Sequence, residues 1–359
     1  MILKSILLAA SLVVSGASFA KQVATQGPGG APGSAGEPYQ GMSSIAPIGV
    51  RMDKALDVPE AAKGPAIDPA KGYRVEKLGR DLYMVTDNVY QAMVMVHAAG
   101  VIVVDAPPSL AAYIPKAIAE VTDKKVTHLV YSHSHADHIG AAKSLNSPVI
   151  IAHEETKRLL DRAKDPNRPS PTSTFADRST LKVGGQVLEL SYHGNGHEPG
   201  NIFIYAPEQK VLMVVDVIFP GWMPWRRLAL AQDVPGYFAQ VEKIKSIDFQ
   251  FLVSGHVARV GTKADVKVQS EFLDDLKAAA GQALKTTEPG KFLNPQDAGN
   301  PWAYYDNYID RVAVQCVNTL SGKWANRLAA FDVFIWDLLR DGAEPAHRLM
   351  RRPGKPCPT

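Results

Sequence analysis

Hydrophobic and polar positions follow two different periods along the chain. Short apolar runs rich in β-branched residues indicate strands, and apolar residues that recur every three or four positions indicate helices with one buried face. The predicted strands cover 82–85, 89–97, 101–105, 126–131, 149–152, 187–192, 201–205, 211–215 and 251–253. The predicted helices cover 109–121, 139–145, 154–163, 235–247, 264–284 and a pair within 303–339. Strands mixed with helices favour a layered α/β architecture.

The N-terminal region has the pattern of an export signal. Lys4 precedes a short apolar run, and Ala20 closes a site of small residues, so residues 1–20 are predicted to be a signal peptide. An uncleaved anchor is the alternative, but the run is well short of the ~20 residues that span a bilayer. The Pro- and Gly-rich stretch 21–48 is predicted to be a disordered arm. We therefore expect a periplasmic or secreted protein that starts at Lys21 and has no integral membrane span.

The composition of the chain argues against several classes of protein. The chain has 359 residues, of which 46% are hydrophobic, so it can bury a sizeable core. With 39 basic and 36 acidic residues the net charge is +3, which gives no basic footprint for nucleic acid. Cys316 and Cys357 are the two cysteines, too few for a disulfide-rich scaffold or a cysteine-rich zinc module. The sequence leaves open whether they pair.

The main candidate for chemistry is the polar stretch after the apolar run 126–131. It reads Ser-His-Ser-His-Ala-Asp-His-Ile-Gly and starts at Ser132. His133 and His135 can converge on one metal, and Asp137 and His138 can point to a second. Imidazole and carboxylate groups suit zinc, and the end of a strand is where open α/β sheets place ligands.

This His-x-His-x-Asp-His motif resembles the metallo-β-lactamase fold superfamily. Three later positions extend the resemblance: His197 in a Gly-rich stretch, Asp216 after an apolar run, and His256 after another. Taken singly, Asp216 also fits a turn cap and His256 a core histidine. The resemblance implies an α/β fold, an αββα sandwich over residues 49–262, with a helical C-terminal extension over 263–359 packed on it.

The resemblance also implies a ligand set for two Zn²⁺ ions per chain. The first ion would be bound by His133, His135 and His197, the second by Asp137, His138 and His256, and Asp216 would bridge them. Open coordination leaves room for a bridging hydroxide, as in a catalytic zinc site. Asp137 is also the candidate catalytic residue that orients the nucleophile or moves its proton.

The expected activity is that of a metal-dependent hydrolase. The β-lactamases of the family that use a cysteine on the second metal need one between His197 and His256, and this chain has none there. It is therefore more similar to the branch of glyoxalase II, lactonases and esterases, acting on a small ester, lactone, thioester or cyclic amide, β-lactams included. The alternatives are an iron-dependent persulfide oxygenase, a sulfatase or phosphoesterase, and a metal-binding surface protein with a vestigial site. The oligomeric state stays open.

The aromatic loop after Asp216 is the candidate substrate-binding segment. Trp222 and Trp225 can form a wall of the site, and Arg226 can pair with a substrate carboxylate. The alternative is a packed loop whose aromatic rings belong to the core. Three further histidines are expected to be structural: His128, His153 and His193.

Overall fold

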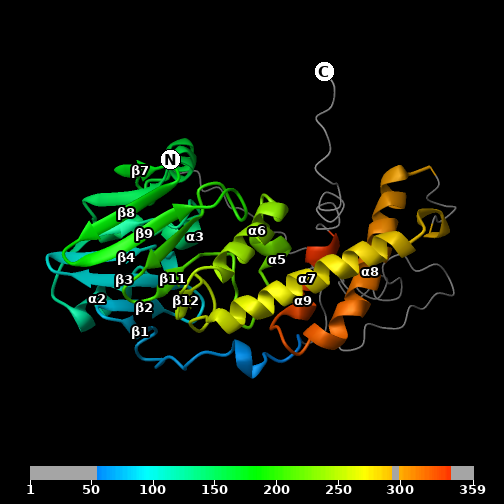
Figure 1. The fold of residues 1–359 in the computed structure, drawn as a ribbon, viewed down its shortest axis with the longest axis horizontal. Coiled ribbons are helices and arrows are strands. Elements are labelled where there is room, and N and C mark those ends of the chain that lie inside the picture. Colours follow the sequence, from blue (N-terminus) through cyan, green and yellow to red (C-terminus); the bar gives the residue numbers. More distant parts are fainter. Residues whose placement is uncertain (1–54, 293–298, 341–359) are drawn as a thin grey trace, which may run out of the picture.

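The computed structural model describes residues 55–292 and 299–340 of the chain (Figure 1). The predicted signal segment 1–20, the arm 21–48 and Cys357 lie outside these residues. Within the described part, no helix combines the length and the hydropathy that crossing a membrane requires.

The first sheet has seven strands, which lie side by side in the order of the chain. Its first four strands form an antiparallel meander, and each later strand joins in parallel. The strands are β1 (Arg74–Gly79), β2 (Leu82–Thr86), β3 (Gln91–His97), β4 (Gly100–Val104), β5 (Val126–Val130), β6 (Val149–His153) and β7 (Ser173–Phe175).

The second sheet has five strands in the order β12-β11-β10-β9-β8. Neighbouring strands are antiparallel except β11 and β12, which are parallel. The strands are β8 (Arg178–Val183), β9 (Gln186–Tyr192), β10 (Ile202–Ala206), β11 (Val211–Met213) and β12 (Phe251–Val253).

Alternating side chains give the first sheet two buried faces. On β3, Met93 and Met95 belong to the core between the sheets, whereas Val94 and Val96 belong to the core under the outer helices. This assignment follows from the period of two along a strand. The helices on this outer side are α2 (Ile114–Val121), α3 (Ala136–Ile139) and α4 (Glu154–Ala163).

Helix α6 (Val234–Lys245) covers the outer face of the second sheet, and α7 (Lys263–Thr286) packs beside it. Leu212 of β11 shares one buried cluster with Tyr237 of α6 and Phe272 of α7. The layers therefore run helix, sheet, sheet, helix (Figure 1). The predicted αββα sandwich is confirmed.

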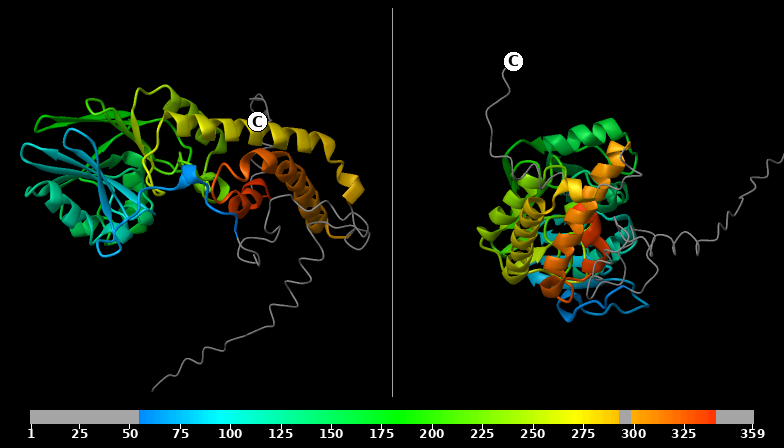
Figure 2. Two further views of the ribbon diagram at one scale, coloured as in Figure 1. Left: turned by 90° about the horizontal axis from the view of Figure 1, so that it is seen from below. Right: turned by 90° about the vertical axis from the view of Figure 1, so that its right-hand side faces the viewer.

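The C-terminal region is helical, as predicted. Helix α7 packs along α8 (Pro301–Trp324), and α9 (Phe331–Arg340) packs against α8. Figure 2 shows these helices reaching out from one end of the sandwich. Their apolar faces continue the cluster of the second sheet, because Trp324 and Phe331 are fully buried in it.

The predicted helix 139–145 is wrong as a single element. Helix α3 ends at Ile139, and a separate 3₁₀ turn covers Ala142–Leu145. A Cβ atom on Gly140 would lie 2.3 Å from the carbonyl oxygen of Ala136. The chain turns there at a position that only glycine fills without a clash.

Strands β1, β7 and β8 are absent from the sequence prediction. In β8 the exposed positions alternate with half-buried ones, and none of its side chains is fully buried. A strand at the edge of a sheet therefore carries a weak apolar signal.

Candidate metal centre

The seven predicted ligands lie at the carboxyl ends of four strands. The stretch from His133 to His138 follows β5, His197 lies between β9 and β10, Asp216 follows β11, and His256 follows β12. Strands β9, β11 and β12 run in one direction because β10 is antiparallel to β9 and β11, and β12 is parallel to β11. Their carboxyl ends meet at one edge of the second sheet. The backbone nitrogen of Ile202 donates to the carbonyl of Ser132 at 3.0 Å and joins this edge to the end of β5.

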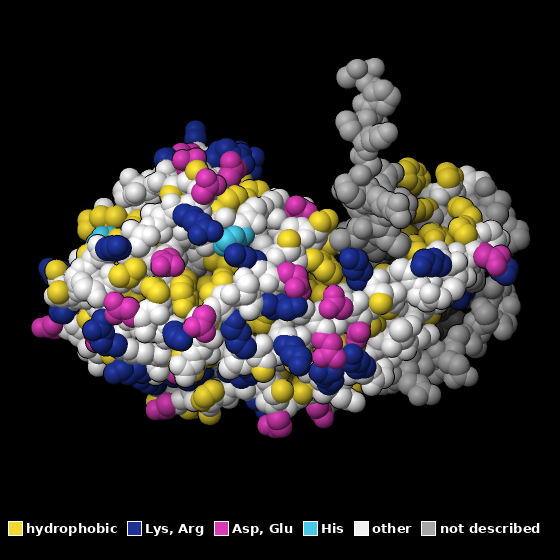
Figure 3. Space-filling view, in the orientation of Figure 1, with side chains coloured by type: hydrophobic (Ala, Val, Ile, Leu, Met, Phe, Trp, Pro, Cys, Tyr) yellow, Lys and Arg dark blue, Asp and Glu magenta, His cyan; other side chains and the backbone are white. Residues whose placement is uncertain are grey.

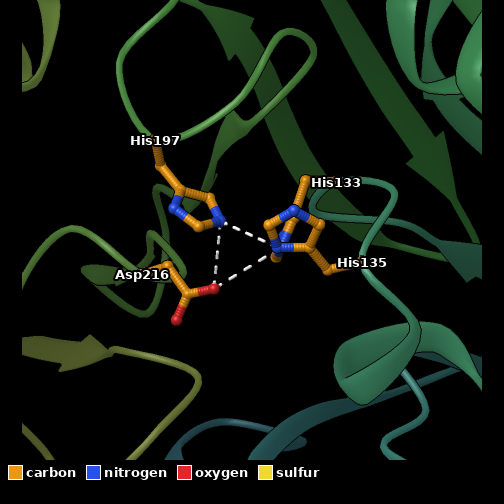
Figure 4. Close-up of side chains that lie close together, drawn as sticks. All are labelled: His133, His135, His197 and Asp216. Atoms are coloured by element: carbon orange, nitrogen blue, oxygen red, sulfur yellow. Dashed lines mark hydrogen bonds and ion pairs between the residues drawn. The ribbon is translucent and has the colours of Figure 1, made fainter. Parts of the chain in front are cut away.

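Four side chains form the first group: His133, His135, His197 and Asp216 (Figure 4). Their ligand atoms all lie within 4.8 Å of one another. Nε2 of His197 lies 3.1 Å from Nδ1 of His135 and 3.2 Å from Oδ2 of Asp216. Nε2 of His133 lies 3.5 Å from the same oxygen. The four side chains surround one point.

Three side chains form the second group: Asp137, His138 and His256, again with ligand atoms within 4.8 Å. The Nε2 atoms of His138 and His256 are 3.0 Å apart. Oδ2 of Asp137 lies 3.5 Å from Nε2 of His138 and 3.8 Å from Nε2 of His256. Each group combines ligands from both sheets, because the stretch after β5 of the first sheet contributes to both groups and the second sheet positions His197, Asp216 and His256.

Asp216 contacts both groups. Besides its first-group partners, its Oδ2 lies 3.1 Å from Nε2 of His138, and its Oδ1 lies 3.0 Å from Nε2 of His256. The side chain is 6% exposed, and the backbone φ of +62° lies in the left-handed region. A non-glycine residue in that region is strained, and such strain persists only where the surroundings fix it.

Burial and charge set the protonation of these groups. Burial, with the neighbouring histidines, lowers the pKa of His133 well below its usual value, so its ring is neutral. Burial opposes ionisation of Asp216, but the charges of His138 and His197 hold the pKa of this carboxyl well below its usual range. The centre therefore combines an ionised carboxylate with a neutral imidazole.

These residues fit a pair of divalent cations. Nε2 of His133 is buried and has no hydrogen-bond partner, although it faces the first group. A buried polar atom without a partner is costly unless a ligand satisfies it. Ligand atoms around tetrahedral zinc lie about 3.3–3.4 Å apart for bonds near 2.0–2.1 Å, and the separations of 3.0–3.8 Å in the second group bracket that value. The donor set suits zinc.

Two further side chains, which the sequence did not predict, contact the centre. Glu198 is buried, and its Oε2 lies 2.9 Å from Nε2 of His135. The hydroxyl of Tyr90 lies 3.4 Å from Oδ2 of Asp137, and its ring packs on His256 with 4.7 Å between centroids. The position of Glu198 beside His197 was a usable signal. Tyr90 lay inside a predicted strand and gave none.

Asp105 supports the loop that carries the first ligands. It follows β4, is fully buried, and accepts a hydrogen bond from the backbone nitrogen of Ser132 at 2.8 Å through Oδ1. Burial raises the pKa of Asp105 to about 6. The bond fixes the chain just before His133.

The three predicted substrate-binding residues occupy different environments. Trp222 is half-buried, and its Nε1 donates to the carbonyl of Ala62 at 3.0 Å. Trp225 is 46% exposed and lies next to Arg226, the first residue of the short turn α5 (Arg226–Leu230). Among the described residues, the hydrogen bonds and ring contacts do not join these three side chains to the seven ligands. Their role in binding stays a prediction.

The loop around these residues begins and ends at the centre. The ring of Phe219 stacks near His256 with 6.0 Å between centroids, and the backbone nitrogen of Gln232 donates to the carbonyl of His197 at 3.0 Å. Residues 219–232 therefore connect the two ligand groups, with the exposed Trp225 between them.

The remaining predicted structural histidines are hydrogen-bonded outside the centre. His153 accepts from the backbone nitrogen of Glu155 and caps α4. His128 bonds with Thr127, and His193 bonds with Ser191. Their interpretation as structural residues agrees with these contacts.

The chain is similar to two curated proteins with different names. It is 26% identical over 229 residues to the 2,4-dinitroanisole O-demethylase subunit alpha of Nocardioides sp. (strain JS1661), covering 60% of this chain and 69% of that protein. It is 33% identical over 101 residues to the metallo-beta-lactamase type 2 of Bacillus cereus, covering 27% of this chain and 39% of the relative. The match thus spans well under two thirds of the Bacillus protein.

The chain also matches a solved structure and a family model. The metallo-beta-lactamase from Pontibacter korlensis is 19% identical, with a TM-score of 0.49, and the match covers 56% of this chain and 99% of that one. Residues 85–256, which include all seven predicted ligands, match the family model of the metallo-beta-lactamase superfamily. The chain therefore carries a domain of the metallo-beta-lactamase superfamily over these residues.

Proposed function

We propose that this chain is a dinuclear zinc hydrolase. The observation that supports this most directly is Asp216, whose carboxylate contacts His197 of the first group and His138 and His256 of the second. Two cations held there would lower the pKa of a shared water toward neutrality and polarise the carbonyl of a substrate. A structural zinc site usually needs four closed ligands around one ion, whereas here seven side chains are shared between two groups.

The protein's own residues would position the reactants. Asp137 is the half-exposed member of the centre, since its side chain is 45% exposed while that of His138 is fully buried. It is therefore the group best placed to accept a proton from the attacking water and pass it to the leaving group. Asp216 would fix the positions of the two ligand groups relative to each other because it contacts both.

The proposed substrate is a small ester, lactone, thioester or cyclic amide, β-lactams included. Attack of water on an acyl carbon needs a nucleophile and a site for the developing oxyanion, and two cations can supply both. Residues 219–232, which connect the two groups, are the proposed source of substrate selectivity.

A second candidate is cleavage of an aryl methyl ether. It is favoured by the relative named 2,4-dinitroanisole O-demethylase subunit alpha, to which 60% of this chain is similar. An iron-dependent persulfide oxygenase and a sulfatase or phosphoesterase are further alternatives, which differ in the metal and in the bond that breaks. We also propose that the protein is exported and acts in the periplasm or outside the cell, after cleavage near Ala20.

Metal analysis and a substrate panel test this proposal. Purified protein is expected to contain two zinc ions per chain, and chelation is expected to abolish hydrolysis. The panel includes acyl esters, lactones, thioesters, β-lactams, sulfate and phosphate esters, a persulfide and 2,4-dinitroanisole. His133→Ala is expected to lose metal, whereas His193→Ala, a matched change outside the centre, is expected to keep it. Full hydrolysis by metal-free protein would refute the proposal.

A further inference from the structure

Glu198 is a buried carboxylate that touches the first group of ligands without belonging to it. Its side chain is 4% exposed, and Oε2 lies 2.9 Å from Nε2 of His135. Oε1 accepts a hydrogen bond from the backbone nitrogen of Ser134 at 2.7 Å. Burying a charge is costly unless hydrogen-bond partners compensate. Each carboxylate oxygen of Glu198 has such a partner.

The ring of His135 has two nitrogens, and they face different partners. Nδ1 lies 3.1 Å from Nε2 of His197, on the side of the ligand group, while Nε2 faces Glu198. A neutral imidazole has a proton on one nitrogen and a lone pair on the other. An ionised carboxylate only accepts hydrogen bonds, so it favours the form of His135 with the proton on Nε2. The lone pair is then on Nδ1.

We propose that Glu198 is a positioning residue that fixes the ring and the tautomer of His135, so that Nδ1 faces the first metal. The inference rests on the proposed function because it presupposes a metal in the first group. Carboxylates in this role orient a metal-binding histidine and make it a stronger ligand.

The same side chain also aligns two loops. Glu198 directly follows His197, and its bond to Ser134 reaches the backbone between His133 and His135. One buried carboxylate thereby connects the loop after β5 to the loop before β10. All three histidines of the first group lie on the two loops that it joins.

The alternative role for Glu198 is that of a direct ligand. The two groups of ligand atoms that lie within 4.8 Å of one another do not include it. Its Oε2 lies beyond His135 as seen from His197, because it contacts the nitrogen of the ring that faces away from that histidine. The geometry therefore favours a role through His135.

Zinc affinity of the full chain tests the proposal. Glu198→Ala is expected to weaken zinc binding at one of the two sites by about 10–100-fold, measured by competition with a chelator. Glu198→Gln keeps the shape, and its amide oxygen can accept the same bond from Nε2, so it is expected to retain part of the affinity. Glu189→Gln on β9 removes one exposed negative charge and is expected to bind zinc as the wild type does.

The tautomer of His135 can be measured without any assay of activity. In zinc-loaded wild-type protein with ¹⁵N-labelled histidine, NMR is expected to show the proton of His135 on Nε2, with His135→Asn used for the assignment. A proton on Nδ1 would overturn the proposal. So would wild-type zinc affinity in Glu198→Ala, or a zinc-loaded crystal structure with a Glu198 oxygen bound to the metal.

These outcomes separate this inference from the proposed function. Wild-type protein that binds no zinc would contradict both. Wild-type protein that binds two zinc ions and hydrolyses its substrate, with unchanged affinity in Glu198→Ala, would contradict only the role of Glu198. Circular dichroism checks the fold of each variant, and if Glu198→Ala does not fold, Glu198→Gln and the wild-type NMR spectrum decide.

Discussion

Two acidic residues at the edge of the sandwich adopt backbone angles that side chains other than glycine rarely take. Asp105 has a φ of +61° and Asp216 a φ of +62°. Each costs of order 1–3 kcal/mol, and each is buried beside the ligand loops. Strain at a buried carboxylate is expected where the position of that carboxylate matters more than local stability.

The variant Asp216→Asn is expected to lose metal. Asparagine keeps the shape but removes the negative charge that lies between the two groups, so the repulsion between two cations is less screened. Metal content should fall from about two toward one per chain by elemental analysis, and kcat on the preferred substrate should fall by about 10²–10³. Asp248→Asn, at a side chain that is 80% exposed, is the control. Two retained metals with near-normal kcat would show that Asp216 is only structural.

The two tryptophans of the loop are expected to behave differently. Trp222→Phe removes the hydrogen bond to Ala62 and should lower the free energy of unfolding by about 0.5–1.5 kcal/mol. Trp225 is 46% exposed, so Trp225→Ala should leave stability nearly unchanged and raise KM if the ring contacts substrate. Denaturant unfolding and steady-state kinetics on both variants measure this. Unchanged KM in Trp225→Ala would place the ring outside the substrate site.

The side chains that cluster in the centre could be predicted from the sequence more readily than those that support them. Residues such as His133 and Asp216 follow apolar strands, and their imidazole and carboxylate side chains are typical metal-binding groups. Tyr90 follows no such rule, because its role depends on the pairing of its backbone with His256 across the chain. Side-chain direction in the folded molecule, as for Glu198 toward His135, is set by tertiary packing that a single sequence does not display.

At the scale of elements, the start of α7 is fixed by a polar cluster. Thr262 and Asp265 form a capping box, in which the backbone nitrogen of Thr262 donates to Oδ2 of Asp265 at 2.8 Å. Arg259 contacts both oxygens of Asp265, at 3.0 and 2.5 Å. The cluster begins at Arg259, three residues after His256, and therefore connects the last predicted ligand to the helix.

The variant Asp265→Ala is expected to destabilise the fold in a pH-dependent way. Burial opposes ionisation of Asp265, but Arg259 outweighs it and lowers the pKa of this carboxyl. A lowered pKa gives stability that is present above the unfolded value of about 3.9 and is lost as the pH falls through the folded value. The loss in the free energy of unfolding should be about 1–3 kcal/mol at pH 7 and should shrink below pH 4. Chemical denaturation across pH measures it, with the exposed Asp274→Ala as control.

The elements that the sequence predicted well are those with strong burial patterns. The buried strand β4 and the long helix α7 match their predictions within a few residues. The short turn α5 gave no signal, because Arg227 and Leu228 adopt left-handed backbone angles that their residue types do not favour. Such conformations arise from tertiary contacts rather than from local preference.

At the scale of the whole molecule, segments outside the family match connect to the centre. The carbonyl of Ala61 accepts from Nε of Arg259 at 2.7 Å, near His256. Gln269 of α7 accepts from the backbone nitrogen of Phe219 at 2.8 Å and donates to the carbonyl of Val217, just after Asp216. Helix α7 therefore contacts the segment that follows Asp216.

The cluster shared by the second sheet and the C-terminal helices predicts one unfolding transition for the sandwich and the helices. Trp324 of α8 is fully buried against Phe272 of α7, with 5.3 Å between ring centroids, and Nε1 donates to Asp275 at 2.9 Å. The cluster that contains it extends without a break to Leu212 of the second sheet. Removing the ring is therefore expected to weaken both parts together.

The variant Trp324→Ala is expected to cost about 3–5 kcal/mol, because it leaves a cavity in this shared core. Calorimetry of metal-loaded protein should show one transition shifted to lower temperature, with metal released in the same step. Trp302→Ala, at a tryptophan of the same helix that is 81% exposed, should leave the transition unchanged. Two separate transitions, with metal retained through the first, would show that the helices fold on their own and that the Gln269 contact does not couple them to the centre.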